Sequence, residues 1–354
     1  MKLEDLRKKI DAADDRILRL LNARASLARR VGTLKQKTGQ DFYIPHREKK
    51  IIAGLLTRNS GPLSPESIES IYREILNACR SLESRLKVAY FGPEATFTHQ
   101  AALKNFGTAA IYMPVTSIAD VFMEVEKERA DYGVVPIENS TEGVVNHTLD
   151  MFMDADLQIC SEISMPIEQC LLSRSGESKR VKKVYSHPQA LVQCRNWLKE
   201  HLPGVPVIET SSTSAAARRV LREKDSAAIS SYAAAQLYKL EVIARGIEDS
   251  PENFTRFLVI GRSSAEYSGH DKTSIMFSLK HKVGALHDML SAFKKYGINM
   301  TKIESRPSRK RAWEYLFFVD FLGHISEKRI QTALKGLSAH CASLKVLGSY
   351  PKAD

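Results

Sequence analysis

A cation stands in the apolar seam of the first predicted helix. Over residues 3–34, apolar residues recur every seven positions in two columns, a pattern typical of a long, packed helix. Arg24 occupies one place in the first column, where a buried guanidinium is costly unless an anion neutralises it. The alternatives are that Arg24 reaches out to water along its aliphatic stem, or that it pairs with a core carboxylate. The spacing therefore predicts either a pocket for an anion or a structural ion pair.

Further charged residues flank the same stripe. Arg7 and Lys35 lie one step past the second column, and Arg47 and Glu48 open a second helix after Pro45. Several cations with few acidic residues among them suit a small dianion, because arginine holds carboxylates through paired hydrogen bonds. The first chemistry that the sequence predicts is therefore the binding of a small dicarboxylate.

The length of the helix separates two of these cations. Arg7 and Arg24 lie about 26 Å apart along a straight helix, so they cannot both contact one small ligand from the same chain. Arg24 and Lys35 are only about 16 Å apart and can bracket a ligand with their long side chains. We therefore predict an intertwined dimer with antiparallel long helices, in which Arg7 reaches the site from the second chain.

Residues 1–86 resemble the all-helical chorismate mutases. The resemblance rests on residues 6–11 (LRKKID), 20–24 (LLNAR), 31–35 (VGTLK) and 45–48 (PHRE). It implies that the substrate is contacted by Arg24, Lys35, Arg47 and Glu48, and by Arg7 from the partner subunit. Fixed cations would hold the two carboxylates of chorismate for its pericyclic rearrangement to prephenate, which needs no nucleophile, base or metal.

Two positions depart from that family. Ile44 stands where many relatives have Asp, which removes one contact to a substrate hydroxyl. Glu83, at the end of a third helix predicted from Pro65 to about Leu86, stands where others have Gln. Gln donates to the ether oxygen of chorismate at any pH, whereas Glu donates only when protonated. We therefore predict higher mutase activity at mildly acidic pH, unless Glu83 is only a solvated residue at a helix end.

Length and composition limit the remaining possibilities. The 354 residues suffice for two or three domains, and no apolar run is long enough to span a bilayer. The first residues are charged and helical and lack the apolar core of a signal peptide. The five cysteines show no C-x-x-C spacing, so we expect reduced thiols in a cytoplasm, no metal site and no cofactor. The net charge of +11 permits nucleic-acid binding, but its spread along the chain favours anionic metabolites as partners.

Between residues 87 and 265 the pattern changes to alternating strands and helices, which predicts α/β architecture. Strands are expected at 88–92, 110–115, 132–137, 158–163, 167–172, 182–185, 206–210, 226–230 and 255–260, and helices at 98–106, 117–129, 145–154, 188–201, 213–223 and 230–239. A weak repeat, in which residues 116–119 and 212–215 each open a helix that leads to a strand, predicts two similar lobes with a cleft between them, as in binding-protein folds. The hydroxyls that open these helices either cap them or grip a carboxylate.

Polar residues gather where predicted strands end, at 92–99, 136–140, 186–189 and 253–257, and the ends of strands are where α/β sites collect. Together these stretches resemble prephenate dehydratases, most closely at residues 135–143 (VPIENSTEG), 186–189 (SHPQ) and 255–257 (TRF). The resemblance covers essentially the whole segment. Ala95 departs from it, because relatives usually have Gly there, which raises the question of whether the first loop keeps its backbone shape.

The resemblance implies that prephenate loses its ring hydroxyl and ring carboxylate to give phenylpyruvate, which calls for a hydrogen-bond donor at the leaving hydroxyl. By the family pattern that donor is Thr255. Arg256 either holds a carboxylate or forms a structural salt bridge, and Glu138 either contacts the substrate or orders its loop. His99 and His187 rank below Thr255, since the family pattern demands neither. The other candidate substrate contacts are Asn139, Ser186, Gln193, Ser212, Thr213, Ser214 and Phe257.

After a predicted linker at 262–272, the order strand, helix, strand, strand, helix, strand indicates a small βαββαβ sheet with two helices on one face. The predicted elements are 273–279, 284–296, 300–307, 313–322, 326–338 and 343–350. No cluster of acid, base and nucleophile is visible, so a binding module is expected. Residues 284–286 (GAL) and 304–307 (ESRP) resemble ACT regulatory domains, although a helix start and an ordinary strand end would look similar. The resemblance implies a phenylalanine site at a domain interface, formed by Gly284, Ala285, Leu286, Glu304, Ser305, Arg306 and Pro307, with Asn299 nearby.

The three resemblances imply a multidomain, bifunctional chorismate mutase and prephenate dehydratase that is inhibited by phenylalanine. We expect an all-α dimeric domain at 1–86, a two-lobed α/β domain at 87–265 and an α+β ACT domain at 266–354, in a homodimer or tetramer. One alternative is an amino-acid-sensing regulator whose basic charge serves nucleic acid. Another is a dehydratase whose helical segment is only a dimerisation arm.

Overall fold

The computed structural model describes residues 2–38, 42–279, 282–308 and 315–353. The chain forms two compact units. The first comprises Met1–Lys87 with Phe106–Ile111, and the second comprises Val88–Asn105 with Tyr112–Asp354. Among the described residues, no helix combines the length and the apolarity needed to cross a membrane.

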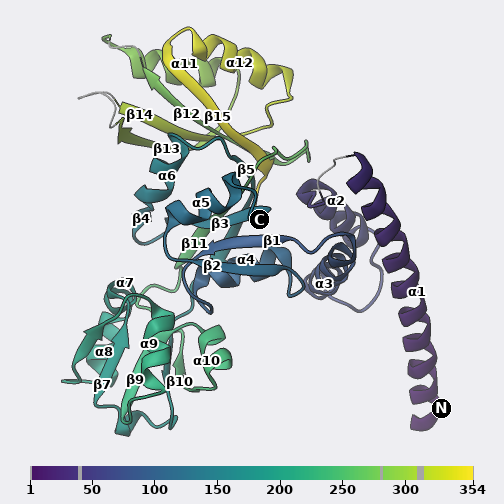
Figure 1. The fold of residues 1–354 in the computed structure, drawn as a ribbon, viewed down its shortest axis with the longest axis vertical. Coiled ribbons are helices and arrows are strands. Elements are labelled where there is room, and N and C mark those ends of the chain that lie inside the picture. The colour runs from purple at the N-terminus through teal and green to yellow at the C-terminus, as the bar shows by residue number, and fades with distance from the viewer. Residues whose placement is uncertain (1, 39–41, 280–281, 309–314, 354) are drawn as a thin grey trace. The chain divides into compact units, whose positions relative to one another are not determined.

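The described residues of the first unit form three helices: α1 (Leu3–Thr38), α2 (Pro45–Leu56) and α3 (Pro65–Glu83) (Figure 1). The hydroxyl of Ser64 caps α3 by accepting from the Ser67 N–H, and Pro65 fills the first helical position, where a missing N–H has no consequence. The helix ends three residues before the predicted Leu86, because Ser84 is extended. α1 packs against α3. They approach closely at Gly32, where an added Cβ would lie 2.7 Å from the Glu83 Cα.

The second unit begins with two lobes, each built on one sheet. The first sheet has the order β2-β1-β3-β11-β5, with the short β4 paired to β3, and the second has the order β10-β6-β9-β7-β8. The chain passes from the first lobe to the second between β5 and β6 and returns between β10 and β11. The predicted α/β architecture with two lobes is confirmed.

The first lobe contains β1 (Lys87–Phe91), α4 (Phe97–Phe106), β2 (Ile111–Val115), α5 (Ile118–Glu126), β3 (Tyr132–Asn139), β4 (Gly143–Val144), α6 (Asn146–Phe152), β5 (Gln158–Pro166) and β11 (Phe254–Gly261). The second contains β6 (Cys170–Ser173), β7 (Lys183–Ser186), α7 (Pro188–Gln193), α8 (Arg195–His201), β8 (Val207–Glu209), α9 (Thr213–Val220), β9 (Ser226–Ser230), α10 (Tyr232–Tyr238) and β10 (Glu241–Arg245), with a 3-10 turn at Ser178–Arg180.

Two elements of the second lobe differ from the prediction. The helix expected at 188–201 is broken into α7 and α8 at Cys194, whose backbone leaves the helical region (φ −111°, ψ 16°). The strand β10 was not expected. Lys239 ends α10 in a left-handed conformation (φ 52°) and the chain turns into β10 from there, at a position where no glycine signals a stop.

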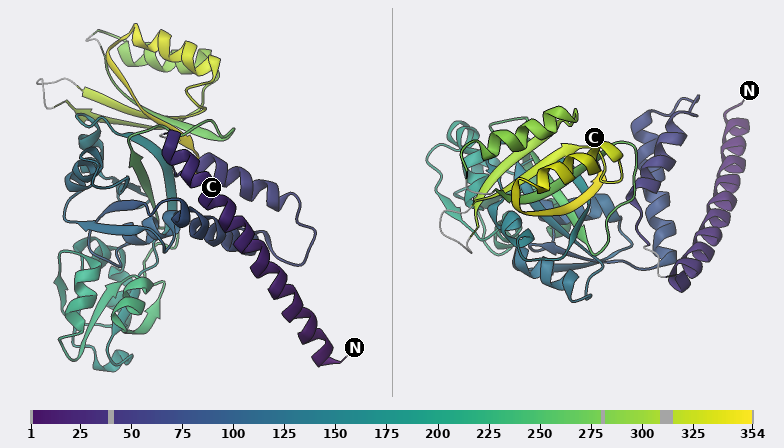
Figure 2. Two further views of the ribbon diagram at one scale, coloured as in Figure 1. Left: turned by 45° about the vertical axis from the view of Figure 1, so that its right-hand side comes forward. Right: turned by 90° about the horizontal axis from the view of Figure 1, so that it is seen from above.

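The chain ends in a four-stranded sheet of order β13-β14-β12-β15, with α11 and α12 side by side on one face (Figure 2). The elements are β12 (Asp271–Leu279), α11 (Ala285–Lys295), β13 (Met300–Pro307), β14 (Tyr315–Leu322), α12 (Lys328–Ser338) and β15 (Cys341–Pro351), which confirms the βαββαβ order. Of the strand predicted from residue 313, the first two residues lie outside the described ones. β15 packs on β5 of the first lobe. At Gly348 a side chain would lie 2.3 Å from the Ile159 carbonyl oxygen, so only glycine permits this approach.

Candidate active sites

A lysine and a glutamate from α1 and α3 meet in the helical unit. The Nζ atom of Lys35 lies 3.2 Å from the Glu83 Oε2 atom, and it also donates to the Phe42 carbonyl oxygen at 3.3 Å. Both side chains are largely withdrawn from water, with 11% and 13% of their surfaces exposed. Gly32 lies one turn before Lys35 and lets α1 approach the backbone of Glu83. The predicted residues Lys35 and Glu83 are therefore brought together.

A second ion pair lies beside the first. Arg80 of α3 donates from Nη1 to the Glu48 Oε1 atom at 2.8 Å, and from Nη2 to the Asn77 Oδ1 atom at 2.5 Å and the Phe106 carbonyl oxygen at 3.1 Å. Its guanidinium also stands 5.0 Å from the ring centre of Tyr43. Arg80 was missed in the sequence, although a cation one helical turn before Glu83 lies on the same face of α3.

The four side chains form one electrostatic group, which we call the helical charge cluster: Lys35, Glu48, Arg80 and Glu83. Burial raises the pKa of Glu48, while the positive charges of Arg80, Arg73 and Lys35 oppose that shift and Glu83 adds to it. Two cations and two carboxylates thus face one another at the ends of α1 and α3 and the start of α2. A bound dianion could take over the hydrogen bonds that Lys35 and Arg80 now make to Glu83 and Glu48, because both cations already lie close to one another.

The other predicted cations of this region take no part in the ion pairs of the cluster. Arg24 is half-buried on α1, whereas Arg7 and Arg47 are exposed. In the described part of the chain, the side chains of these three residues make no ion pair. Ile44 stands at the N-cap of α2 and supplies no capping side chain, a role that Asp would fill.

The apolar columns of α1 remain uncovered within one chain. Large aliphatic residues along the whole helix are 40–68% exposed: Leu3, Leu6, Ile10, Ile17, Leu18, Leu20, Leu27, Val31 and Leu34. Such a continuous apolar face is typical of an interaction surface. Both columns that predicted a packed seam are present, but the surface that packs on them belongs to no described residue of this chain.

In the second unit, Thr255 on β11 lies beside Asn139 at the end of β3. The Asn139 Nδ2 atom donates to the Thr255 Oγ1 atom at 2.8 Å and to the Asn253 Oδ1 atom at 2.7 Å. The amide is oriented by its other end, because the Asn139 Oδ1 atom accepts from the backbone and hydroxyl of Thr141. Since the Thr255 oxygen is an acceptor in this bond, its own proton is directed elsewhere. No described residue accepts that proton, so the hydroxyl is available as a donor.

Gln193, at the end of α7, joins this pair to the segments that connect the lobes. Its Nε2 atom donates to the Glu142 Oε1 atom at 2.8 Å, and its Oε1 atom accepts from Asn253 and Gln169, each at 3.2 Å. The predicted residues Thr255, Asn139 and Gln193 thus belong to one polar network where β3, β11 and α7 meet. Asn253 and Glu142 lie inside the motifs that the sequence singled out, but Gln169 carried no signal.

The predicted serines have local partners. The hydroxyl of Ser186 is fully buried and donates to the Ile229 carbonyl oxygen at 2.7 Å. Ser212 caps α9 by accepting from the Ala215 N–H at 3.0 Å, which is the capping alternative. Ser214 donates to the Glu94 carbonyl oxygen at 2.5 Å and so holds the loop after β1. The neighbouring Thr213 is half-buried at the start of the same helix.

The loop after β1 adopts its conformation without a glycine at position 95. Ala95 is buried in a left-handed backbone conformation (φ 63°), which a non-glycine residue adopts at a cost. Its carbonyl oxygen accepts from Ser231, and its N–H donates to the His99 Nδ1 atom at 3.1 Å. Burial lowers the pKa of His99, and His187 shows the same shift for the same reason while it caps α7. Both histidines therefore serve as local acceptors.

Arg256 lies on the face of β11 opposite Thr255, because successive side chains of a strand alternate between faces. Its guanidinium donates to Glu162 at 2.6 Å, to Asp320 at 2.6 Å and to Glu138 at 2.9 Å. Of the two roles predicted for Arg256, the structural salt bridge is therefore the one that the geometry supports. Glu138 is engaged in the same way, and Phe257 is a core residue with 2% of its surface exposed.

The candidate effector residues occupy α11 and β13. Gly284 takes a left-handed conformation (φ 78°) immediately before α11, followed by the buried Ala285 and the partly exposed Leu286. The motif at 304–307 forms the end of β13, and its Arg306 donates to Asp150 of α6 at 3.0 Å. Asn299 is exposed and accepts a backbone hydrogen bond from Leu322. Within the described residues, no hydrogen bond joins the two motifs.

Comparisons with known proteins match three families along the chain. Residues 6–84 match the chorismate mutase type II family, residues 88–265 match the prephenate dehydratase family, and residues 273–339 match the ACT domain. A bifunctional chorismate mutase/prephenate dehydratase of Aquifex aeolicus is 53% identical over 99% of this chain and 98% of the relative. One of Pseudomonas aeruginosa is 46% identical over the same shares. The crystal structure of a prephenate dehydratase from Arthrobacter aurescens in complex with L-Phe superposes with a TM-score of 0.71 at 36% identity, covering 76% of this chain and 91% of that one.

Proposed function

Because the chain belongs to the family of bifunctional chorismate mutase/prephenate dehydratases, we propose that its reactions are divided between the helical charge cluster and the Thr255–Asn139 pair. The proposed division assigns residues 1–86 to the mutase, 87–265 to the dehydratase and 266–354 to an ACT domain that binds the effector. The five cysteines are free thiols, which supports a reducing cytoplasm as the working compartment.

The mutase site is shared between two copies of the chain. In this proposal Lys35, Arg24 and Arg47 of one chain hold the two carboxylates of chorismate, and Arg7 enters from the partner. The observation that carries the proposal is the uncovered apolar face of α1, which a second, antiparallel α1 would cover. Two such helices would bring the Arg7 end of one chain toward the Lys35 end of the other.

The cluster needs no covalent chemistry for this reaction. Lys35 and Arg80 are already placed by Glu83 and Glu48, so their positions require little reorganisation when a dianion binds. Glu83, when protonated, donates to the ether oxygen as the C–O bond breaks. Positioning and charge stabilisation of this kind supply the acceleration.

The dimer is tested by a charge placed in the apolar face of α1. Leu20→Glu should give a monomer in analytical ultracentrifugation and lose mutase activity, while the dehydratase rate remains. The control is Lys9→Glu, which changes a charge on the same exposed helix outside the two apolar columns. A Leu20→Glu dimer with full mutase activity would contradict the shared site.

The dehydratase reaction takes place at Thr255. The C–O bond of the ring hydroxyl breaks with its electrons moving to oxygen. The Thr255 hydroxyl donates its proton to that oxygen, which leaves as water, and the Thr255 oxygen regains a proton from solvent. The bond to the ring carboxylate breaks at the same time, carbon dioxide departs, and its electron pair completes the aromatic ring. The Asn139 side chain donates a hydrogen bond to the Thr255 Oγ1 atom, so the proton of the Thr255 hydroxyl points away from Asn139.

Thr255→Val tests this assignment, since it removes the hydroxyl and keeps the shape. The dehydratase kcat should fall by roughly 10²-fold or more, as for the loss of one positioned acid. Thr255→Ser is the matched control and should retain most of the rate. Prephenate formation from chorismate should be unchanged in both variants, and an active Thr255→Val enzyme would refute the role.

Phenylalanine is the effector in this proposal. The relative from Arthrobacter aurescens was crystallised with L-Phe, which supports the same ligand for the ACT domain of this chain. We place it between the start of α11, at residues 284–286, and the end of β13, at residues 304–307, with Asn299 nearby. Titration calorimetry on Ser305→Trp, which fills this exposed position, should show weakened phenylalanine binding, and unchanged binding would move the site elsewhere.

A further inference from the structure

Buried charges join the dehydratase lobe to the ACT sheet behind the proposed dehydratase site. Glu138 and Arg256 belong to β3 and β11, whereas Lys302 and Asp320 belong to β13 and β14. Arg256 binds Asp320 at 2.6 Å and Glu138 at 2.9 Å, and Lys302 pairs with the second oxygen of Glu138. Arg256 also donates to the Tyr350 hydroxyl at 2.8 Å. We call these residues the interface charge network: Glu138, Arg256, Lys302, Asp320 and Tyr350.

The strand register connects this network to the catalytic pair. On β3 and β11, Thr255 is paired with Asn139 and Arg256 with Glu138. Adjacent side chains alternate between faces, so each member of the catalytic pair is the chain neighbour of a member of the network. A movement of Glu138 or Arg256 therefore moves the backbone that carries Asn139 or Thr255.

We propose that Lys302 and Asp320 are positioning residues for the dehydration, acting through Glu138 and Arg256 on Asn139 and Thr255. This inference rests on the proposed function of Thr255. It assigns the ACT sheet a part in building the active site, in addition to binding the effector. The ACT sheet thereby holds two neighbouring strands of the dehydratase lobe from behind.

Most of the side chains in these pairs are shielded from water. Arg256 and Asp320 are each 12% exposed and Lys302 is 14% exposed, whereas Glu138 is 31% exposed. The pKa of Glu138 is lowered, since the charges of Lys302 and Arg256 outweigh the opposing effect of burial. Removing one partner from such a group leaves another charge uncompensated, so the remaining side chains must rearrange.

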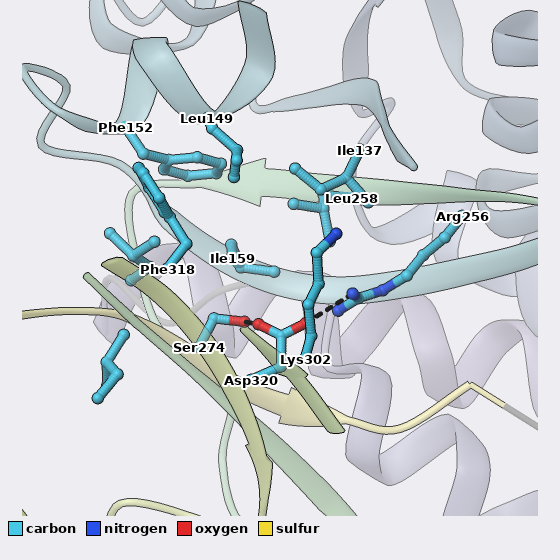
Figure 3. A pocket seen from close by; sticks show the side chains of 12 residues that line it. Ile137, Leu149, Phe152, Ile159, Arg256, Leu258, Ser274, Lys302, Phe318 and Asp320 are labelled. Carbon is cyan, nitrogen blue, oxygen red and sulfur yellow. Dashed lines mark hydrogen bonds and ion pairs between the residues drawn. The ribbon is translucent and has the colours of Figure 1, made fainter. Parts of the chain in front are cut away.

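Side-chain packing leaves a gap at this point. A cavity of about 20 Å³ lies between the lobe and the ACT sheet, enough for roughly one water molecule. Figure 3 shows Arg256, Lys302 and Asp320 converging on one side of it, while its remaining lining is mostly apolar. The polar pairs therefore lie beside an apolar contact between the two sheets, next to the catalytic strands.

The same network reaches the candidate effector strand. Lys302 and Arg306 are half-buried on the same face of β13. Both bind the dehydratase lobe: Lys302 pairs with Glu138, and Arg306 pairs with Asp150. A ligand at the end of β13 that displaced the strand would act on Glu138 through Lys302. This gives inhibition a physical route, because the effector needs only to favour one position of β13 over another.

A double-mutant cycle tests the proposal in the full-length protein. Lys302→Met and Glu138→Gln should each lower the dehydratase kcat by about tenfold, with a smaller change in KM, as expected for a misplacement well below 1 Å. If Lys302 acts through Glu138, the double variant should be no slower than the slower single variant. Lys302→Arg, which keeps the pair, should restore most of the rate, and Lys302→Met should also weaken inhibition by phenylalanine.

The matched control is Lys345→Met. Lys345 lies at the same interface but donates to the carbonyl oxygens of Phe152 and Ala155, so its loss leaves the network intact. Its dehydratase kcat should equal that of the unaltered protein. Additive losses in the double variant, or an equal loss in Lys345→Met, would show that only general interface stability matters and would overturn the proposal.

Failure of the inference is distinguishable from failure of the proposed function. If Thr255→Val is inactive while Lys302→Met and Glu138→Gln keep full kcat, only the positioning role is wrong. If Thr255→Val is active, the dehydratase assignment itself is wrong. Should Lys302→Met not give a cooperative melting transition, Asp320→Asn replaces it and is paired with Arg256→Lys in the same cycle, with the same two outcomes.

Discussion

The contact between Gly32 and Glu83 gives the sharpest prediction about the mutase site. An added Cβ at Gly32 would lie 2.7 Å from the Glu83 Cα and 2.8 Å from its Cβ. Carbon atoms pack at about 3.5 Å or more, so α1 and α3 must separate by about 0.8 Å in Gly32→Ala. Overpacking of this kind typically costs about 1–3 kcal/mol of unfolding free energy.

The same separation acts on the charge cluster. Lys35 and Glu83 are held 3.2 Å apart across this contact, so pushing the helices apart displaces both. A displacement near 1 Å at a positioned group can cost roughly 10²-fold in rate. We expect Gly32→Ala to lose most of its mutase activity and to unfold at a lower temperature, with the dehydratase rate unchanged.

Gly54 of α2 is the matched control for this substitution. A Cβ there meets nothing within 4 Å, so Gly54→Ala should stabilise the helix by about 0.5–1 kcal/mol and leave the mutase rate unchanged. Chemical denaturation and a chorismate-consumption assay on the two variants measure both quantities. Equal behaviour of Gly32→Ala and Gly54→Ala would refute the close approach of α1 to α3.

Three further predictions concern single side chains. Glu83→Gln should flatten the pH profile of the mutase, which is otherwise higher at mildly acidic pH, because an amide donates at any pH; a profile that keeps its slope would contradict the role of Glu83. Ala95→Gly removes the cost of a left-handed alanine, about 1 kcal/mol of unfolding free energy, but it also removes a buried methyl group that contributes about 0.8 kcal/mol. The melting temperature and the dehydratase rate should therefore barely change. A large loss in either would show that the methyl group matters more than the backbone conformation. Burial lowers the pKa of His99 below its ordinary value, so just below pH 6.5 the unfolded chain binds more protons than the folded one, and stability is lost as the pH falls through that range. His99→Asn, whose side-chain oxygen can accept the Ala95 N–H, should show a smaller loss in melting temperature between neutral and acidic pH. An unchanged loss would locate the titrating group elsewhere.

The sequence predicts the helices and strands well where hydrophobic spacing or a capping residue marks them. The long helix α1 follows from its two apolar columns, and Ser212 marks the start of α9. Breaks without glycine or proline were not predictable in the same way. Cys194 divides one expected helix, and Lys239 ends α10 in a left-handed conformation that its side chain does not favour.

The candidate sites show a similar division. Lys35 is indicated by its place beside the apolar columns and Glu83 by the family resemblance, and the two meet in space. Arg80 enters the cluster because α3 packs against α2. For Arg256, the alternation of side chains along a strand already places it opposite Thr255. Its partners Asp320 and Tyr350 come from 64 and 94 residues away in the chain, which no local pattern reveals.

The most direct test of the shared mutase site mixes two inactive variants. Arg7→Ala and Arg24→Ala should each be dimeric and nearly inactive as mutases, because every site lacks one cation. After unfolding and refolding together in equal amounts, half of the dimers contain one chain of each kind, and each of those has one intact site, so about one quarter of the activity should return. No recovery in a mixture shown to contain mixed dimers would contradict the account, since both arginines would then serve a site within a single chain.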